Sequence, residues 1–382
     1  MKHILTALVI LALFLPSLSA VDYGGAISNR SGTEGPFSDM GFEQENQITA
    51  WVRVPFDNRG KTEFAAEGMY RFTWTKEDGP LHILDMGLFK FHTSFGLIDN
   101  LSLRIDAGRF GISDITGLVF SQPSDGLRVA IESPSFGIAF YGGYTGLLNE
   151  QVVSIYTGEA EEKTDYPYSL APAYIPAGIS VRLPLFFMNQ TFSSETFGFF
   201  DPRREHHRIY MTLGLNGPIV GRLYYVAAAV FGVDIEDGNM VNGASHLSKL
   251  ELNYYPGFLS SSISLDGVFA SGEFGRMNAF TPFTVVSVLP AAEWSMLYSG
   301  LLKTGLTFTI KPVDPLFCLA QAHLLFDMPG KGEYPSWGGW QWILSARYNL
   351  FSDLNLSLGA GQFIPKSGDS HFYLNLKAVI VL

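Results

Sequence analysis

The sequence predicts an all-β protein, specifically a transmembrane antiparallel up-and-down β-barrel of about 18 strands, within a range of 14–18. Three observations support this fold class. Apolar and polar residues alternate along many long segments, and in a β-strand such residues point to opposite faces. No apolar run after residue 20 approaches the roughly 20 residues that a membrane-spanning helix needs. Short and long connections alternate between these segments, as in barrels of the outer membrane.

The clearest strand is residues 62–75, which read TEFAAEGMYRFTWT. Its even positions, from Phe64 to Trp74, are apolar or neutral, whereas its odd positions, from Glu63 to Thr73, are mostly polar. At about 3.3 Å per residue, this segment is long enough to cross about 25 Å of hydrocarbon even when tilted. Its aromatic residues cluster toward one end, where a spanning strand meets the lipid headgroups. We therefore expect a strand of the barrel wall here.

The first twenty residues have the pattern of a secretory signal peptide. Lys2 and His3 precede an apolar run over residues 4–15, and small residues follow the break at Pro16. The run is short for an uncleaved membrane anchor, which is the alternative interpretation. The remaining chain, residues 21–382, is expected to form a single outer-membrane β-barrel domain.

Seventeen further segments are expected to be strands. In one of them, the phase of the alternation shifts near Phe89. Residues 22–32 are included as a strand because single-chain bacterial barrels have an even strand number. The segments are 22–32, 48–56, 81–95, 101–107, 127–132, 136–147, 173–187, 190–200, 206–215, 220–233, 247–255, 260–271, 303–311, 318–326, 341–350, 354–360 and 372–382.

The expected connections fall into two classes, as do the short periplasmic turns and longer outer loops of up-and-down barrels. The short ones are 57–60, 97–100, 133–135, around 188, 216–219, 255–259, 313–315 and 351–353. The longer ones are 112–125, 148–172, 201–205, 234–246, 272–297, 328–338 and 364–370. A soluble secreted sandwich or propeller would also have one apolar face per strand. The strand lengths, the undivided chain and the absence of a blade period favour the barrel.

Composition excludes some functions and partners. The net charge of −11 argues against nucleic acid, and the single cysteine, Cys318, allows no intramolecular disulfide. We expect no cofactor and no bound metal. The expected partners are outer-membrane lipids, the barrel-assembly machinery and small hydrophilic solutes, and a homo-oligomer is left open.

If the apolar rows face lipid, the polar rows enclose a lumen. An eighteen-strand barrel is too wide for side chains alone to fill, so water or an inward-folded loop must occupy it. Cations and anions both occur in these rows and neither dominates, and opposed rows would set a transverse field that orients polar solutes. The alternative is that they are ordinary wall residues paired with one another. The candidate pore-lining residues are Arg53, Glu63, Glu67, Arg71, Arg104, Asp106, Arg182, Lys249, Glu251, Lys303, His323, Arg347 and Lys377.

One stretch, residues 108–128 (GRFGISDITGLVFSQPSDGLR), carries a resemblance to a known group. It resembles a segment of large Gram-negative outer-membrane porins, including alginate-export-type and related substrate-specific barrels. In those proteins a strand ending in Gly-Arg-aromatic runs through an Asp-x-x-Gly loop into Asp-Gly-Leu-Arg and the next strand. The matching positions are Gly108, Arg109, Phe110, Asp114, Gly117, Asp125, Gly126, Leu127 and Arg128. The chain departs from the group in its balanced luminal charge, unlike a polyanion exporter, and in its terminal Leu382, where an aromatic residue is usual.

Three loops are candidates for controlling passage. The acidic loop 148–172 is expected either to fold inward as a cation-favouring constriction or to be a solvated surface loop. Residues 201–208 are a basic cluster that would hold a phosphate or lipopolysaccharide group, or else pair internally with Asp201 and Glu205. Loop 272–297 would form a hydrophobic lid. Its apolar residues are Phe274, Phe280, Phe283, Val285, Val286, Val288 and Leu289.

The predicted function is an outer-membrane porin that passes small hydrophilic solutes by passive diffusion. A FadL-like transporter of hydrophobic substrates is one alternative, although no N-terminal hatch precedes the first strand, and a surface adhesin or scaffold barrel is another. No catalytic activity is expected, because the chain has no Gly-x-Ser-x-Gly elbow and its histidines are scattered. His206 and His207 would point to opposite faces of one strand, which disfavours a shared metal ion.

Overall fold

A computed structural model describes residues 21–382, except residues 58, 78, 99, 158–165, 204–205, 237–238, 241–243, 274–277, 285–297 and 329–334. The predicted signal peptide, residues 1–20, lies outside the described residues. The described part contains no helix that is long and apolar enough to cross a membrane.

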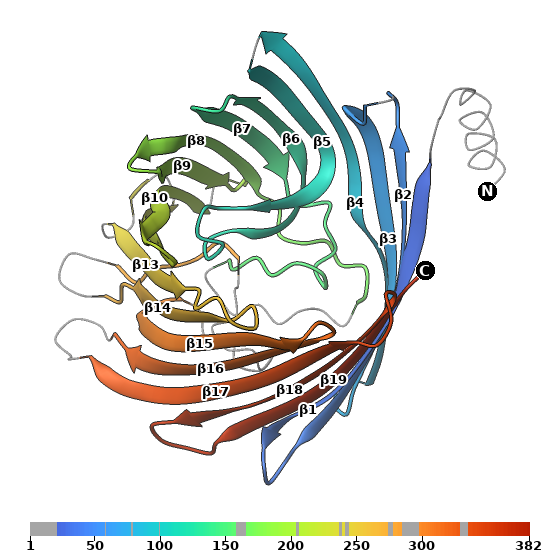
Figure 1. Ribbon diagram of the computed structural model, residues 1–382, viewed down its shortest axis with the longest axis vertical. Helices are drawn as coiled ribbons and strands as arrows, with labels where there is room; N and C mark the ends of the chain where they lie inside the picture. Colours follow the sequence, from blue (N-terminus) through green and yellow to red (C-terminus); the bar gives the residue numbers. More distant parts are fainter. Residues whose placement is uncertain are drawn as a thin grey trace.

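The alternating segments form strands of one antiparallel sheet, which curves into a barrel (Figure 1). The first half of the chain contributes β1 (Asp22–Pro36), β2 (Gly41–Pro55), β3 (Thr62–Thr75), β4 (Gly79–Ile98), β5 (Leu101–Ser113), β6 (Ser121–Glu132), β7 (Gly137–Tyr144), β8 (Ile175–Phe187), β9 (Gln190–Phe200) and β10 (His206–Val220). The second half contributes β11 (Leu223–Glu236), β12 (Asn239–Met240), β13 (Ser245–Tyr254), β14 (Ser262–Ala270), β15 (Leu301–Val313), β16 (Leu316–Asp327), β17 (Ser336–Asn349), β18 (Leu354–Pro365) and β19 (His371–Val381).

The barrel wall has eighteen strands. The sheet contains 19 strands, but β12 has two residues and pairs only with the end of β11, so 19 − 1 strands form the wall. Every wall strand pairs with its neighbours in sequence, and β1 pairs with both β2 and β19, which closes the sheet. The predicted fold class and strand number are therefore confirmed. The long connections lie at one end of the barrel, called the loop end below, together with the short connections after β1 and β3. The other end, called the turn end, carries the connections after β2, β4, β6, β8, β10, β13, β15 and β17.

The outer face carries the apolar rows. Leu250 on β13, Leu344 on β17 and Phe140 on β7 are each about half exposed, at 50%, 53% and 52%. Because these side chains have no protein to cover them, the barrel presents an apolar belt to its surroundings. On the opposite face, β13 carries Lys249 and Glu251, and β17 carries Arg347.

The phase slip near Phe89 has a structural cause. The register between β3 and β4 shifts between Glu67 and Gly68, whose partners are Leu88 and Met86. Gly87 is thus an extra residue in β4, which is a β-bulge, and it moves the following side chains to the opposite face. Phe89 and Phe91 consequently join the exposed row.

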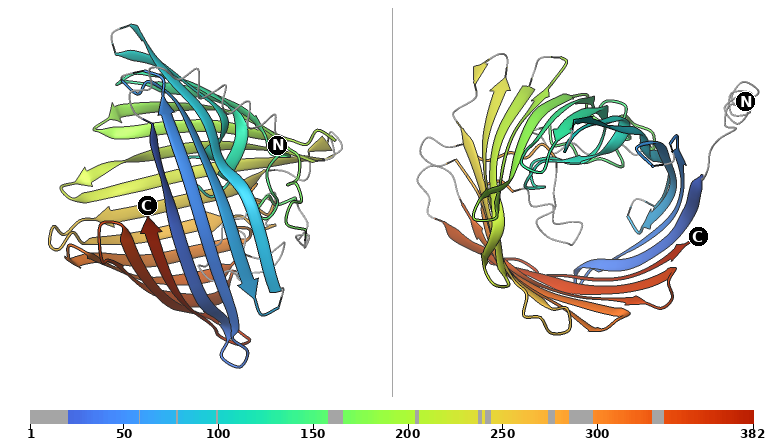
Figure 2. Two further views of the ribbon diagram at one scale, coloured as in Figure 1. Left: turned by 90° about the vertical axis from the view of Figure 1, so that its right-hand side faces the viewer. Right: turned by 45° about the horizontal axis from the view of Figure 1, so that its top comes forward.

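The wall separates between β4 and β5. Their pairing stops at Phe89 opposite Arg109, and the last part of β5 pairs with β6 alone. The ends of β5 and β6 curl into the barrel (Figures 1 and 2). Gly108 permits this bend, since its φ is 112° and a Cβ there would collide with the carbonyl oxygen of Phe89.

Several predicted boundaries were wrong. The expected loop 112–125 is only residues 114–120, because the Gly- and Ser-containing stretch after it pairs with β5 despite lacking apolar alternation. The expected turn at 216–219 belongs to β10, and the turn follows Val220. The first strand extends to Pro36, beyond the predicted end at residue 32.

Candidate functional site

Three connections at the loop end fold into the lumen and are called the luminal loops. They are residues 114–120, 145–174 and 271–300, in their described parts. The first is held compact by Asp114, whose carboxylate accepts hydrogen bonds from the backbone N–H groups of Thr116, Val119 and Phe120 at 2.8, 3.0 and 2.9 Å. A short polar side chain that satisfies neighbouring backbone donors is the usual way to stabilise such a turn.

The luminal loops are joined to one another by backbone hydrogen bonds. The N–H groups of Phe283 and Thr284 donate to the carbonyl oxygen of Val119 at 2.9 and 3.0 Å. The N–H of Tyr156 donates to the carbonyl oxygen of Phe283 at 2.9 Å. The described parts of the three loops therefore form one hydrogen-bonded body inside the barrel.

Aromatic rings attach this body to the inner wall. The ring of Phe283 stacks on Phe199 of β9 with centroids 3.8 Å apart, and Phe120 lies 5.1 Å from the same ring. Tyr210 on β10 completes the contact, 5.8 Å from Phe199. All four side chains are buried. The inner face of β9 and β10 is thus apolar here, which the prediction that polar rows enclose the lumen did not include.

Arg208 on β10 links two luminal loops to the wall. Its guanidinium is fully buried and donates to the carbonyl oxygens of Tyr156 at 2.6 Å and Pro282 at 3.3 Å. Its ion-pair partner is Asp234 on β11, 3.8 Å away. A buried guanidinium is costly unless paired and hydrogen-bonded, so these contacts fix both loops to one position.

Arg71 connects one of these loops, 145–174, to the other side of the barrel. From β3, its guanidinium donates to the carbonyl oxygen of Gln151 at 2.9 Å. Loop 145–174 therefore reaches from β7 and β8 toward β3, and Figure 1 shows this loop crossing the interior.

The strands from β2 to β5 carry a dense charge network. Asp106 on β5 is buried and lies close to three basic side chains: His92 at 2.7 Å, Arg104 at 3.2 Å and Lys90 at 3.6 Å. Arg53 lies 3.9 Å from Glu63. This side of the lumen is polar, in contrast to the aromatic side at β9 and β10.

Arg109 sits where the wall separates. Its guanidinium makes a two-pronged contact with Asp125 of β6, with both distances 2.9 Å, and lies 3.6 Å from Asp85 of β4. It also donates to the carbonyl oxygens of Met86 and Leu147. Arg109 thereby joins β4, β6 and a luminal loop at the bend.

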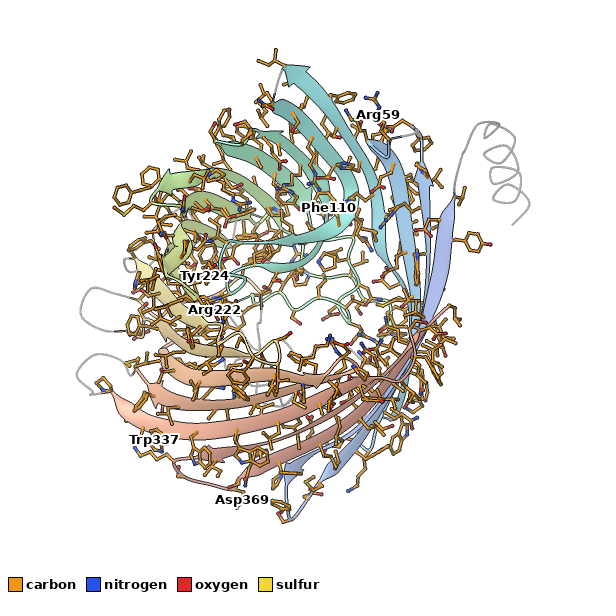
Figure 3. The ribbon with its side chains drawn as sticks, in the orientation of Figure 1. Arg59, Phe110, Arg222, Tyr224, Trp337 and Asp369 are labelled. Carbon is orange, nitrogen blue, oxygen red and sulfur yellow. The ribbon has the colours of Figure 1, made fainter. Side chains whose placement is uncertain are left out.

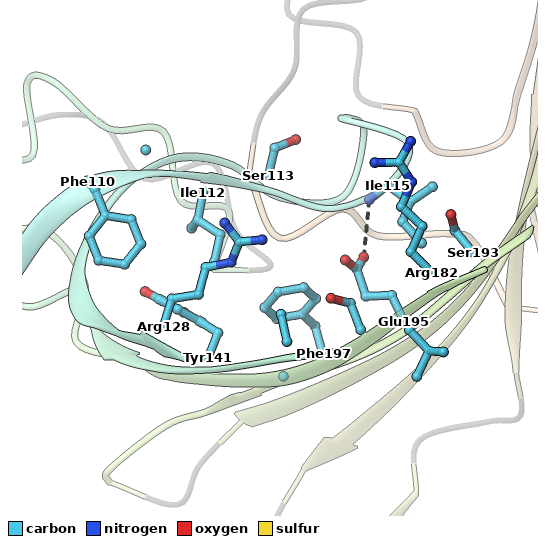
Figure 4. A pocket seen from close by; sticks show the side chains of 15 residues that line it. Phe110, Ile112, Ser113, Ile115, Arg128, Tyr141, Arg182, Ser193, Glu195 and Phe197 are labelled. Carbon is cyan, nitrogen blue, oxygen red and sulfur yellow. Dashed lines mark hydrogen bonds between the residues drawn. The ribbon is translucent and has the colours of Figure 1, made fainter. Parts of the chain in front are cut away.

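A cavity of about 290 Å³ lies between the curled end of β5 and the inner wall of β6–β9 (Figure 4). Phe110, marked on β5 in Figure 3, forms part of its apolar lining together with Phe197. Arg128 and Arg182 line it and also line an adjoining cavity of about 280 Å³. Glu195 is buried beside it and accepts a hydrogen bond from the N–H of Ile115 at 3.2 Å. Within the described residues, neither arginine has a carboxylate within ion-pair distance.

The structure brings some of the predicted pore-lining residues together and leaves others apart. Besides the pairs above, Lys249 lies 3.9 Å from Glu251, and His323 lies 3.6 Å from Asp266 on the neighbouring side of the barrel. The remaining ones are spread over five strands: Glu67 on β3, Arg182 on β8, Lys303 on β15, Arg347 on β17 and Lys377 on β19. Their role as pore-lining residues stays a prediction.

The three predicted loop features have different outcomes. Loop 148–172 folds inward in its described part, which includes Glu150, but the other acidic residues of the predicted constriction, within 158–165, lie outside the described residues. The basic cluster 201–208 is divided: Arg208 is buried in the lumen, His206 is 3.7 Å from Glu236, and His207 contacts Phe200 on the other face. Arg204 and Glu205 lie outside the described residues.

Of the seven apolar residues predicted for a hydrophobic lid, two lie within the described residues. Phe280 and Phe283 are fully buried against the wall and the other loops. Phe274, Val285, Val286, Val288 and Leu289 lie outside the described residues.

Sequence reasoning missed the importance of Arg208, Glu195 and Arg128. A signal for Arg208 existed in the alternation of β10, because it shares the face of Tyr210 and Thr212 rather than that of Met211. The run Phe197-Gly198-Phe199-Phe200 likewise gave a signal, because Phe197 and Phe199 share the inner face whereas Phe200 is exposed on the outer face. Among the described residues, no group of three or more His, Cys, Asp or Glu side chains is placed to hold a metal ion.

No family model matches the chain, and no curated protein matches its sequence. Solved structures do resemble it. The Pseudomonas aeruginosa protein OpdL has 12% identity and a TM-score of 0.63 over 96% of this chain and 99% of its own. OccK2 (OpdF) of the same organism, in complex with glucuronate, has 11% identity and a TM-score of 0.62 over 96% and 98%. The outer membrane protein OpdK has 12% identity and a TM-score of 0.60 over 94% and 99%. These likenesses show a shared barrel fold.

Proposed function

We propose that this barrel is an outer-membrane channel through which small hydrophilic solutes diffuse passively. The observation that carries the proposal is the two-sided lumen. The luminal loops pack on the aromatic inner face of β9 and β10. The inner face of β2–β5 carries charged side chains instead. A passage bordered by fixed charges of both signs favours polar, hydrated solutes over apolar ones.

Compact hydroxylated anions are the solutes that we propose to test first. Arg128 and Arg182 line the cavity beneath the curled end of β5, and a guanidinium can hold a carboxylate through two parallel hydrogen bonds. The likeness to OccK2, which was solved with glucuronate, supports the choice of that compound as a probe.

The proposed location is the outer membrane of a diderm bacterium, with residues 1–20 directing export. The apolar belt would contact lipid, and the loop end would face the exterior, as in barrels with long outer loops. The turn end would then face the periplasm. Insertion would depend on the barrel-assembly machinery of the cell.

The packing of the barrel interior gives less support to a FadL-like transporter. A fatty acid would need an accessible apolar passage, but Phe120, Phe199 and Phe283 are completely buried by one another and by the wall. An adhesin would use the outer loops for binding and would require no passage at all.

Reconstitution into planar lipid bilayers tests the proposal. Purified protein should give stepwise increases in conductance, and vesicles containing it should swell in isosmotic glucuronate. Uptake of fatty acid without any conductance would instead establish the transporter. Absence of both activities from correctly folded protein would leave the adhesin alternative.

A further inference from the structure

The outer face of β1 and β2 interrupts the apolar belt. Their outward row includes Ile27 and Ile48, which lie opposite each other and are exposed, whereas Arg30 and Glu43 point inward and form an ion pair of 3.3 Å. Toward the loop end, the same outward row continues with uncharged polar side chains, which we call the polar patch. Its members are Asn29, Ser31, Thr33, Gln44 and Asn46. The strand register places Asn29 opposite Asn46 and Ser31 opposite Gln44.

Aromatic side chains mark the level of the polar patch in the wall. Phe42, the next outward residue after Gln44 toward the loop end, is 42% exposed, and its ring lies 5.9 Å from that of Trp74 on β3. Exposed aromatic residues of a barrel gather where acyl chains meet headgroups. The four residue steps from Phe42 to Asn46 cover about 13 Å along the strand, or about 10 Å after a tilt of about 40°. Asn46 and its partner Asn29 therefore lie within the apolar belt.

The polar patch keeps hydrogen-bonding capacity that this chain does not use. Nδ2 of Asn29 donates to Oδ1 of Asn46 at 2.7 Å, which leaves further N–H groups on both amides. In the described part of the chain, the amide of Gln44 and the hydroxyl of Ser31 make no side-chain hydrogen bond. Acyl chains offer no donor or acceptor, so an unpartnered amide at this depth is costly. A partner with polar groups of its own would remove that cost.

The rest of the described outer face has no comparable group of amides. Outside the polar patch, the outward carboxamide of the described wall strands is Gln362 on β18, and it accepts a hydrogen bond from the indole N–H of Trp342 at 3.3 Å. Ser194 and Thr196 are outward on β9, but a hydroxyl has one donor whereas an amide has two. The unused donors of the described outer wall are thus concentrated on β1 and β2, which are neighbours on one side of the barrel (Figure 1).

We propose that the polar patch is the contact surface between two copies of this chain in the membrane. A second copy fits because amides and hydroxyls both donate and accept hydrogen bonds, so the patch is complementary to itself. The patch carries no charge, so identical patches do not repel each other. Toward the turn end, the same outward row contains Gly25 opposite Ala50, and such small residues let two walls approach closely. The inference rests on the proposed membrane location, whereas a passage through one barrel does not depend on it.

Cross-linking in phosphatidylcholine vesicles tests the contact. In a Cys318→Ser background, Ser31→Cys places a thiol in the polar patch. Met211→Cys, the matched control, places one on the outer face of β10, at the opposite side of the closed wall. At a low protein-to-lipid ratio, a flexible bis-maleimide should give several-fold more dimer with Ser31→Cys than with Met211→Cys. Equal yields would show random collision, and a dimer through residue 211 alone would show another interface. Both results would overturn the inference.

A second measurement follows energy transfer between copies labelled at Ser135→Cys, on the turn after β6. The double variant Asn29→Leu/Asn46→Leu should reduce the transfer several-fold, because lipid can cover its apolar surface. Gln362→Leu, which removes an outward amide outside the polar patch, should keep the transfer of the parent protein. Heat-modifiable migration on SDS gels verifies that each variant is folded. Unchanged transfer in the double variant would overturn the inference.

The source of any failure can be identified. A fluorophore on Ser31→Cys that brominated-chain phosphatidylcholine quenches fully, in protein that shows no transfer between copies, would mean that lipid covers the polar patch, and the inference would be wrong. Stepwise conductance without cross-linking at residue 31 would also overturn the inference but leave the channel. Cross-linking at residue 31 without conductance would do the reverse.

Discussion

The guanidinium of Arg71 donates a hydrogen bond to the carbonyl oxygen of Gln151, 2.9 Å away, across 80 positions of the chain. This bond joins the charged side of the wall to a loop that Arg208 of β10 holds nearby, at the carbonyl oxygen of Tyr156. Loop 145–174 is therefore fixed at two places. Because this loop borders the proposed passage, the position of that border does not depend on one contact alone.

Replacement of Arg208 should widen the passage. Arg208→Ala removes hydrogen bonds to Tyr156 and Pro282, and bonds made by a charged group are worth about 1.5–3 kcal/mol each. Single-channel conductance and open-channel noise should both increase. Arg208→Lys should give an intermediate result, since an ammonium can reach fewer acceptors in this geometry.

The matched control for that experiment is Arg222→Ala. Arg222 donates to the carbonyl oxygen of Pro256 at 2.6 Å, at the turn end and away from the luminal loops. It should leave conductance unchanged. Equal conductance and noise in wild type and Arg208→Ala would show that Arg208 does not position the loops.

Gly108→Ala should impair folding of the barrel. The φ of 112° is unfavourable for alanine, and the added Cβ would collide with the carbonyl oxygen of Phe89, at a cost of about 1–3 kcal/mol for the strained backbone alone. The folded fraction, read from heat-modifiable migration on SDS gels, should fall, and the midpoint temperature should decrease. Gly111→Ala on the same strand has open space around it and should behave as wild type. Similar behaviour of the two variants would count against the bend at Gly108 as a requirement.

Arg128 and Arg182 should favour entry of anions. In the Arg128→Gln/Arg182→Gln double variant, the reversal potential in a salt gradient should shift toward cation selectivity. Binding of glucuronate, measured as blocking of the current, should weaken about tenfold or more, because one lost charged hydrogen bond costs about 1.5 kcal/mol. Arg59→Gln, on a turn outside the lumen, is the control. An unchanged reversal potential in the double variant would separate these arginines from permeation.

The turn between β2 and β3 should be sensitive to acid. The backbone N–H of Lys61 is the largest influence that lowers the pKa of Asp57, and the N–H groups of Arg59 and Thr62 contribute further. Because the folded-state pKa lies below that of the unfolded chain, the stabilisation is complete above the usual carboxyl value of about 4 and is lost as pH falls through the lower folded-state value.

Unfolding rates in SDS, measured from pH 7 to pH 3, check this expectation. Wild type and Asp57→Asn should differ at pH 7, with the variant unfolding faster, and should converge in acid. A constant difference across this range would mean that the charge of Asp57 does not contribute.

The fold was predictable because alternate residues of a membrane-barrel strand face two different environments, lipid and lumen, and differ in polarity accordingly. The strand at 62–75 shows this, since its apolar and polar rows reach the two sides that the pattern indicates. The predicted strand boundaries were wrong where the strand continues although the alternation of apolar and polar residues has ended. Residues 121–126 contain mainly small and polar side chains, yet their backbone groups pair with β5.

The interior was harder to predict because its contacts join residues far apart in the chain. The ring stack of Phe199 and Phe283 and the bonds of Arg208 to two loops depend on which sides of a closed wall face each other. Local pattern does not contain that information. The segment 108–128 is an exception, since its Gly108, Arg109, Asp114 and Asp125 form the bend, the ion pair and the compact loop described above.

The seam between β1 and β19 has a consequence for the order of assembly. Gly25 and Leu382 exchange backbone hydrogen bonds of 3.2 and 2.7 Å, so the two strands that are farthest apart in sequence lie side by side. Such a contact carries the greatest loop-closure cost and belongs at the end of the folding reaction. A circular permutant that links Leu382 to residue 21 and opens the chain at a short turn would make the β1–β19 pair a local hairpin, and the last closure would move to the two strands on either side of the opened turn.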